Sequence, residues 1–127
     1  MRFTGFISDH DPKVPNALPI GFMIYEYNGS EEDKAKTIAY LKQGHFVMGW
    51  MNVDHDVLDG ASIGPSAYLT DGTFVWPHYY TFYLEKYPRF GIQKSFFEHI
   101  ASNQFQVPAV SEERLKELEM ELMNAIK

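Results

Sequence analysis

One twenty-residue stretch constrains the fold more than any other part of the chain: YLTDGTFVWPHYYTFYLEKY, residues 68–87. Asp71-Gly72 lies between two segments rich in β-branched and aromatic residues, and such a two-residue loop is typical of a β-hairpin because both turn positions need positive φ. Pro77 suits the first position of a helix, where its missing N–H has no intrahelical partner to lose. The stretch therefore predicts strand, tight turn, strand and helix, and Pro88 ends the helix.

Upstream of the hairpin, composition predicts three further strands and one helix. The β-rich runs RFTGFI and IGFMIYEY are expected to be strands separated by a proline-containing loop, and HFVMGWMNV is expected to be a third strand. Ser30 is expected to cap the intervening helix, which ends near Gly44, a residue suited to a left-handed conformation. The apolar face of that helix comprises Ala35, Ile38, Ala39 and Leu41.

Downstream, two more helices are predicted. One fits IQKSFFEHIASN, and the other runs from a Ser111 cap to the end of the sequence. Strands followed by helices, without regular βαβ alternation, predict an α+β fold: an antiparallel sheet with the Asp-Gly hairpin, packed by about four helices. We expect a single domain over residues 1–127. The residues expected to face inward from these two helices are Phe96, Phe97, Ile100, Leu115, Leu118, Leu122, Met123 and Ile126.

The helix predicted over residues 77–87 is apolar around more than half of its circumference. Such a helix is either sandwiched between two layers or leaves aromatic surface for a partner. Under the second alternative, Tyr79, Phe82 and the neighbouring Glu85 are the candidate partner-binding residues, because aromatic residues are enriched at interfaces. The main stripe, expected to pack on the sheet, comprises Tyr80, Tyr83, Leu84 and Tyr87.

Charge and composition exclude several classes of partner. Seventeen acidic against eleven basic residues give a formal net charge of −6 at pH 7, which disfavours nucleic acid because duplex binding needs a concentrated positive field. The expected partner is a basic protein or a second copy of the chain. The absence of cysteine fits a reducing cytoplasm. Neither a signal peptide nor membrane association is expected, because no apolar run approaches the roughly 20 residues of a membrane span.

The segment YLTDGTFVWPHYYTFYLEKY followed by FFEHI resembles a signature found in small, mostly uncharacterised bacterial proteins. In that signature a TDG turn leads into a strand, a WP step and an aromatic helix. The resemblance covers Ser62 to Ile100 and implies no reaction. Proteins of this general kind include suspected immunity-like partners of secreted toxins, so the resemblance implies a role in binding another protein.

The tripeptide Asp-His-Asp occurs twice, at residues 9–11 and 54–56, and histidine with carboxylates is a ligand set for zinc, manganese or iron. If both segments lay at one rim of the sheet, they could supply a single metal. Each lies in a polar loop context, however, and no HExxH or HxH spacing fixes two ligands on one element. The candidate metal ligands under this alternative are Asp9, His10, Asp11, Asp54, His55 and Asp56.

Other familiar chemistry is not indicated. The segment DHDVLDG fails as an EF-hand loop, because Leu58 and Pro65 occupy two of its ligand positions. No cysteine, GxSxG elbow or Ser-His-Asp spacing marks a nucleophile, and no cofactor is expected. The expected function is therefore a non-enzymatic cytoplasmic protein-binding domain, in particular an immunity-like inhibitor of a basic toxin. The alternatives are a small metal-dependent enzyme that uses the Asp-His-Asp pairs, and a domain with no separable site.

Overall fold

The computed structural model describes residues 2–126, which contain a four-stranded sheet. Its strands are β1 (Arg2–Phe3), β2 (His45–His55), β3 (Ser62–Thr70) and β4 (Phe74–Pro77), in the spatial order β1–β4–β3–β2. The pairs β2–β3 and β3–β4 are antiparallel as predicted, but β1 is parallel to β4, so the sheet is mixed. The long strand β2 and the very short strand β1 form its two edges.

The helices mostly follow the strands in the chain. They are α1 (Glu31–Lys42), α2 (His78–Lys86), α3 (Lys94–Ser102) and α4 (Glu112–Ile126), with a 3₁₀ turn, η1, at Ile20–Phe22. This arrangement confirms the predicted α+β class. Within residues 2–126, no helix has both the length and the apolar character needed to cross a membrane.

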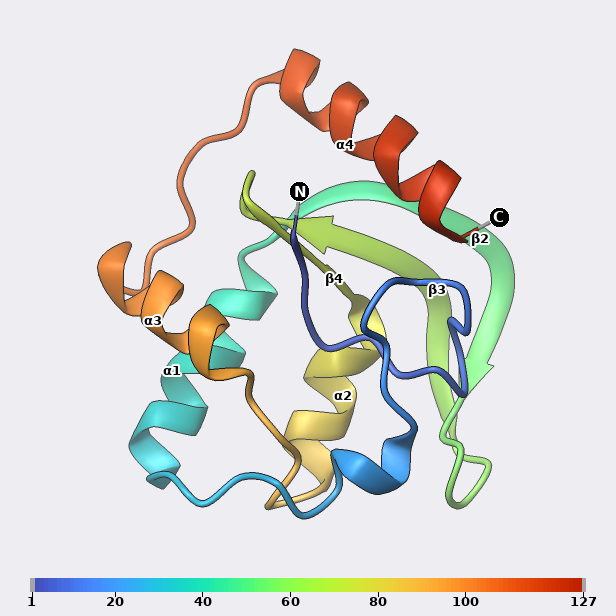
Figure 1. Cartoon of the computed structure of the whole chain (residues 1–127), viewed down its shortest axis with the longest axis vertical. Coiled ribbons are helices and arrows are strands. Elements are labelled where there is room, and N and C mark those ends of the chain that lie inside the picture. The colour runs from blue at the N-terminus through green and yellow to red at the C-terminus, as the bar shows by residue number, and fades with distance from the viewer. Residues whose placement is uncertain (1, 127) are drawn as a thin grey trace.

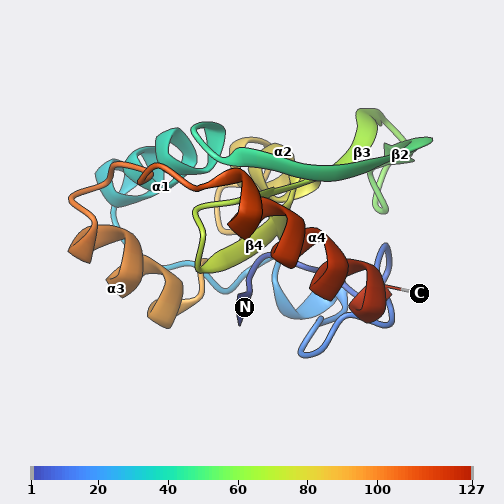
Figure 2. The same ribbon diagram turned by 90° about the horizontal axis from the view of Figure 1, so that it is seen from above.

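The sheet has packed side chains on both faces, because residues alternate in direction along β4. Phe74 and Trp76 are buried in a cluster with residues of α1, α2 and α3, whereas Val75 packs with Leu118 and Leu122 of α4. Figures 1 and 2 show α4 lying apart from the other three helices. The sheet is therefore an inner layer, and α4 covers a surface that the other helices do not reach.

The predicted hairpin joins β3 to β4. Gly72 at its tip has the expected positive φ of 96°, but Asp71 does not. The buried Asp71 carboxylate holds the turn in a different way, because its Oδ1 accepts the backbone N–H groups of Thr73 (2.9 Å) and Phe74 (2.8 Å). Its Oδ2 accepts the hydroxyl of Tyr40 in α1 (2.6 Å), which ties the turn to the helical layer.

The two predicted serine caps are confirmed. Ser30 and Ser111 each accept, through Oγ, the backbone N–H three residues later, at 3.0 and 3.1 Å. The prediction for Gly44 is wrong, since its φ is not positive. Glycine is needed there for space, because a Cβ would lie 2.5 Å from Cζ2 of Trp76.

The first thirty residues contain less strand than the sequence predicts. The run RFTGFI is a strand only over Arg2–Phe3, and Gly5, with φ of 75°, turns the chain just beyond it. The run IGFMIYEY forms η1 and turns, so the strand predicted there is wrong. Its buried and half-buried residues follow the helical spacing i, i+3 and i+4, which a short apolar run does not reveal in advance. These residues are Ile20, Met23 and Ile24.

Helix α1 buries a more polar face than predicted. Ala35 and Ala39 are exposed. Lys34 is buried, and its Nζ donates to the carbonyls of Tyr87 (3.1 Å) and Pro88 (2.8 Å), which lie just beyond the end of α2. One helix thereby satisfies carbonyl groups that the end of another leaves without intrahelical partners. The buried residues of α1 are Lys34, Thr37, Tyr40 and Leu41.

Candidate functional site

The aromatic helix α2 does not present the open face predicted at Tyr79. Its side chain is 1% exposed, so the expectation that Tyr79 lies partly at the surface is wrong. The N-terminal segment covers it: the Tyr79 hydroxyl donates to Asp11 Oδ2 (2.7 Å) and accepts the N–H of Ile7 (3.1 Å), and the ring of His10 lies 4.5 Å away, centroid to centroid. Helix α2 is therefore sandwiched, which is the other arrangement that its apolar circumference allows.

Phe82 and Glu85, the other two candidate partner-binding residues, also contact neighbours. Phe82 is half-buried, and the ammonium of Lys86 lies 5.3 Å from its ring centroid. Glu85 is exposed and pairs with Lys42 at 3.3 Å, a surface contact of small energy. With Tyr79 buried, these residues do not form a continuous aromatic surface.

The first Asp-His-Asp segment is anchored to the aromatic core. Asp9 Oδ1 accepts the N–H of Ile20 (2.8 Å), and His10 Nε2 lies 2.8 Å from the hydroxyl of Tyr83. Burial lowers the pKa of His10, although nearby carboxylates, that of Asp54 foremost, act in the opposite direction. His10 is thus held in its neutral form at neutral pH.

Asp11 accepts two tyrosine hydroxyls, those of Tyr68 (2.9 Å) and Tyr79 (2.7 Å). Burial raises the pKa of Asp11, and the two hydrogen bonds oppose that shift. Each oxygen of this carboxylate accepts one tyrosine hydroxyl. The Asp11 side chain therefore links the N-terminal segment to β3 and α2.

The second Asp-His-Asp segment lies partly at the surface and partly in the protein interior. Asp54 accepts the hydroxyl of Ser66 (2.8 Å) and lies 3.7 Å from Nε2 of His78. His55, the last residue of β2, is exposed. The central histidine of this segment therefore lies at the surface, and its side chain makes no hydrogen bond or ion pair among the described residues.

Asp56 is buried and accepts three donors. They are Lys86 Nζ (2.7 Å), the Tyr87 hydroxyl (2.7 Å) and the N–H of Leu58 (2.8 Å). Burial alone would raise the pKa of Asp56, but the hydrogen bonds from Lys86, Tyr87 and Leu58 outweigh it and hold the pKa below its ordinary value. Asp56 is therefore a charged anchor for the end of α2.

The two Asp-His-Asp segments approach each other through a tyrosine. The hydroxyl of Tyr83 lies 2.8 Å from His10 Nε2 and accepts the N–H of Val57 (3.1 Å), directly after the second segment. Among residues 2–126, no group of three or more histidines, aspartates or glutamates is placed to hold a metal ion. The contacts of this cluster within residues 2–126 include hydrogen bonds between the loops and helix α2.

The most unusual surface of the molecule lies on β2. This strand has β3 on one side only, and both views show it along the outer rim of the fold (Figures 1 and 2). Four of its large apolar side chains are exposed, and Met51 is fully so. We call these residues the β2 surface: Phe46, Trp50, Met51 and Val53.

An irregularity in strand pairing positions the centre of the β2 surface. The register with β3 shifts between Gly49 and Val53, so the intervening residues have no regular partners on β3. Trp50 and Met51 lie within this bulge, where a strand bends and redirects its side chains. Gly49 permits the close approach of β3, because a Cβ there would lie 2.7 Å from the carbonyl oxygen of Ser66.

The neighbour of β2 on one face is an acidic helix. Leu118 and Leu122 of α4 pack with Val47 and Met48 of β2. The described residues of α4 include five glutamates against one arginine and one lysine. The strand that carries the β2 surface therefore packs, through its buried residues, against an acidic helix.

Comparison with protein-family models, with curated proteins and with solved structures finds no match to this chain.

Proposed function

We propose that this chain is a non-enzymatic protein-binding domain and that the β2 surface is its binding site. One observation carries the proposal: of the ten large apolar side chains exposed within residues 2–126, four lie on β2, and two more, Val57 and Leu58, lie in the turn that follows it. Exposed apolar surface of this kind, on a strand with an unpaired edge, favours association with another chain. These features support a binding site on β2 in preference to the aromatic face of α2.

The partner that fits this surface is a basic protein. The chain carries a formal net charge of −6, and α4, whose leucines pack against β2, carries five glutamates within its described residues. Complementary charge steers encounter and selects among partners. We further propose that binding takes place in the cytoplasm and that it is immunity-like, with a basic toxin as the partner, in line with the resemblance over Ser62 to Ile100.

The contacts of the complex follow from the shape of β2. The free edge of β2 offers backbone N–H and C=O groups to an extended segment of the partner, as in strand addition. Trp50 and Met51 in the bulge supply the apolar anchors, because large, desolvated side chains near the centre carry most of the binding energy at an interface.

Site-specific photo-crosslinking tests this proposal in cells that contain the natural partner. A benzophenone amino acid replaces Met51 in one protein and Met120 in the other, since Met120 of α4 is a second exposed methionine (70% exposed) outside the β2 surface. We expect a discrete crosslinked protein of basic composition from position 51 and none from position 120.

Equal crosslinking from both positions, or none from position 51, would contradict the proposed site. A crosslink from position 51 to a second copy of the chain would support the proposed site but contradict the basic partner, because the chain would then bind itself through β2. The crosslinked protein is accepted as the partner only if it also binds the purified domain in the absence of other components.

A further inference from the structure

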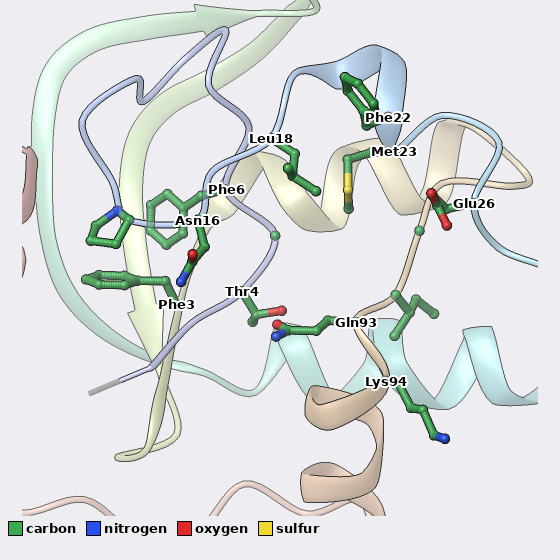
Figure 3. Close-up of a pocket in the computed structure, with 14 residues that line it drawn as sticks. Phe3, Thr4, Phe6, Asn16, Leu18, Phe22, Met23, Glu26, Gln93 and Lys94 are labelled. Carbon is green, nitrogen blue, oxygen red and sulfur yellow. The ribbon is translucent and has the colours of Figure 1, made fainter.

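A second candidate site lies between the N-terminal segment, η1 and the start of α3 (Figure 3). It is a pocket of about 490 Å³, which is within the range of small-molecule sites. Leu18 and Met23 point into the same space from one side, and Phe6 lines the pocket further along (Figure 3). The wall is therefore apolar over much of its extent.

A buried hydroxyl group faces this pocket without a hydrogen bond of ordinary geometry. Thr4 is 3% exposed and lines the pocket, and its Oγ1 makes no such bond with residues 2–126. The hydroxyl of Tyr80 interacts with the Thr4 side chain, but the hydrogen bond that it donates goes to the carbonyl of Gly91 (3.3 Å). In Figure 3 the Thr4 hydroxyl points toward the end of the Gln93 side chain. Buried polar groups normally have a partner, so a ligand atom is a natural one here.

The start of α3 adds an electropositive end to the same pocket. This nine-residue helix begins at Lys94, and its N-cap Gln93 makes no side-chain capping bond. The first N–H groups of a helix have no intrahelical acceptor and lie at the positive end of the helix dipole. Here they belong to Lys94, Ser95 and Phe96, of which Lys94 lines the pocket, and the first turn has no acidic side chain to neutralise them. Anions bind such helix ends readily.

We propose that this pocket binds a small organic monocarboxylate with a short apolar body. One carboxylate oxygen accepts the first-turn N–H groups of α3, and the other accepts the Thr4 hydroxyl. The apolar body lies against Leu18 and Met23. Glu26, which also lines the pocket, repels a second negative charge and so selects against dicarboxylates.

This site is independent of the β2 surface, and its test does not require the protein partner. Uniformly ¹⁵N-labelled protein is titrated with propanoate, hexanoate and 3-phenylpropanoate, and in parallel with the corresponding neutral amides. We expect saturable shifts of the Lys94, Ser95 and Phe96 amide signals with at least one acid. The matching amide should bind at least about tenfold more weakly, because it lacks the charge that the helix end favours.

Three variants make the test specific. Thr4→Val is nearly isosteric and removes a hydroxyl that makes no hydrogen bond of ordinary geometry, so the protein should fold, and the affinity for the acid should fall at least about fivefold. Leu18→Trp fills the pocket from a position that is 46% exposed and should abolish binding. Thr73→Val, at an exposed threonine of the hairpin, is the matched control and should leave the affinity unchanged.

Several outcomes would overturn the proposal. They are the absence of saturable shifts with every acid, equal binding of acid and amide, shifts centred away from the start of α3, and unchanged affinity in Thr4→Val. If Thr4→Val did not fold, retained binding by Leu18→Trp would overturn it equally.

Discussion

At the scale of single residues, Asp71 shows how one buried side chain organises several elements. Besides the two turn N–H groups and Tyr40, its Oδ2 lies 2.9 Å from Nε2 of His99 in α3. The sequence signal of this residue, an Asp-Gly pair, predicts the turn but gives no indication of the contacts with α1 and α3. The side chain is 0% exposed. If the carboxylate were removed, the donors that it now accepts would have to find another acceptor inside the protein.

We predict that Asp71→Ala lowers the free energy of unfolding by about 3 kcal/mol or more, because several buried donors lose their acceptor at once. Urea denaturation of both proteins measures the difference. Asp59→Ala is the control, since that carboxylate is half-exposed and pairs with Lys86 at the surface, and its denaturation midpoint should stay close to that of the unchanged protein. Equal midpoints for Asp71→Ala and Asp59→Ala would contradict this account of the hairpin.

His10 gives a prediction about pH. Burial holds the pKa of folded His10 below its ordinary value of 6.5, so the unfolded state binds more protons as pH falls through this value and the free energy of unfolding decreases. His10→Gln removes that contribution. Its free energy of unfolding should therefore fall less than that of the unchanged protein between about pH 7.5 and about pH 5.5.

His55→Gln is the matched control for this comparison, because His55 is exposed, and it should keep the pH dependence of the unchanged protein. Asp11 has a raised pKa, so it stabilises the folded state as pH falls and opposes His10. It is present in all three proteins. A pH dependence of His10→Gln as steep as that of the unchanged protein would contradict the assigned burial of His10.

At the scale of elements, the sequence predicts best where a local signal decides the structure. The hairpin at Asp71-Gly72, the caps at Ser30 and Ser111, and the long strand β2 all follow from such signals. The inner stripe of α2 is also confirmed at Tyr80, Tyr83 and Leu84, while Tyr87 is half-buried.

Prediction fails where a distant segment determines burial. Helical periodicity places Tyr79 at the flank of the helix, but residues 7–11 fold over it. Nothing in the local pattern of α2 specifies that second layer. The same applies to Lys34, a charged residue that would be assigned to the solvent side of α1 and is instead buried against the end of α2.

The contact between α1 and α2 gives a prediction for Lys34. Lys34→Met keeps the apolar stem but removes the donor to two carbonyls, so the free energy of unfolding should fall by about 2 kcal/mol. Chemical denaturation monitored by circular dichroism measures this loss. Lys36→Met, two residues along the same helix and partly exposed, should change the midpoint little. An effect of Lys34→Met no larger than that of Lys36→Met would show that the buried ammonium adds no stability.

At the scale of the whole molecule, the two Asp-His-Asp segments and the tyrosines of β3 and α2 form one connected network. The sequence indicates the carboxylates and the tyrosines separately but not their contacts, because segments 9–11 and 54–57 are far apart in the chain and are joined by hydrogen bonds to the Tyr83 hydroxyl. This network fixes α2 between its neighbours. The apolar side chains that remain exposed are concentrated on β2, which the sequence predicts as a strand but not as an edge.

The most direct test of the β2 surface is the affinity of the partner crosslinked from position 51, measured by calorimetry with purified proteins. Met51→Lys places a charge on a fully exposed position, so the fold should persist, and the affinity should fall at least about tenfold because an anchor is lost and the basic partner is repelled. Met120→Lys, the control on α4, should bind within about twofold of the unchanged protein, since it lies outside the apolar anchor. Equal loss of affinity in the two variants, or unchanged affinity in Met51→Lys, would contradict binding through the β2 surface.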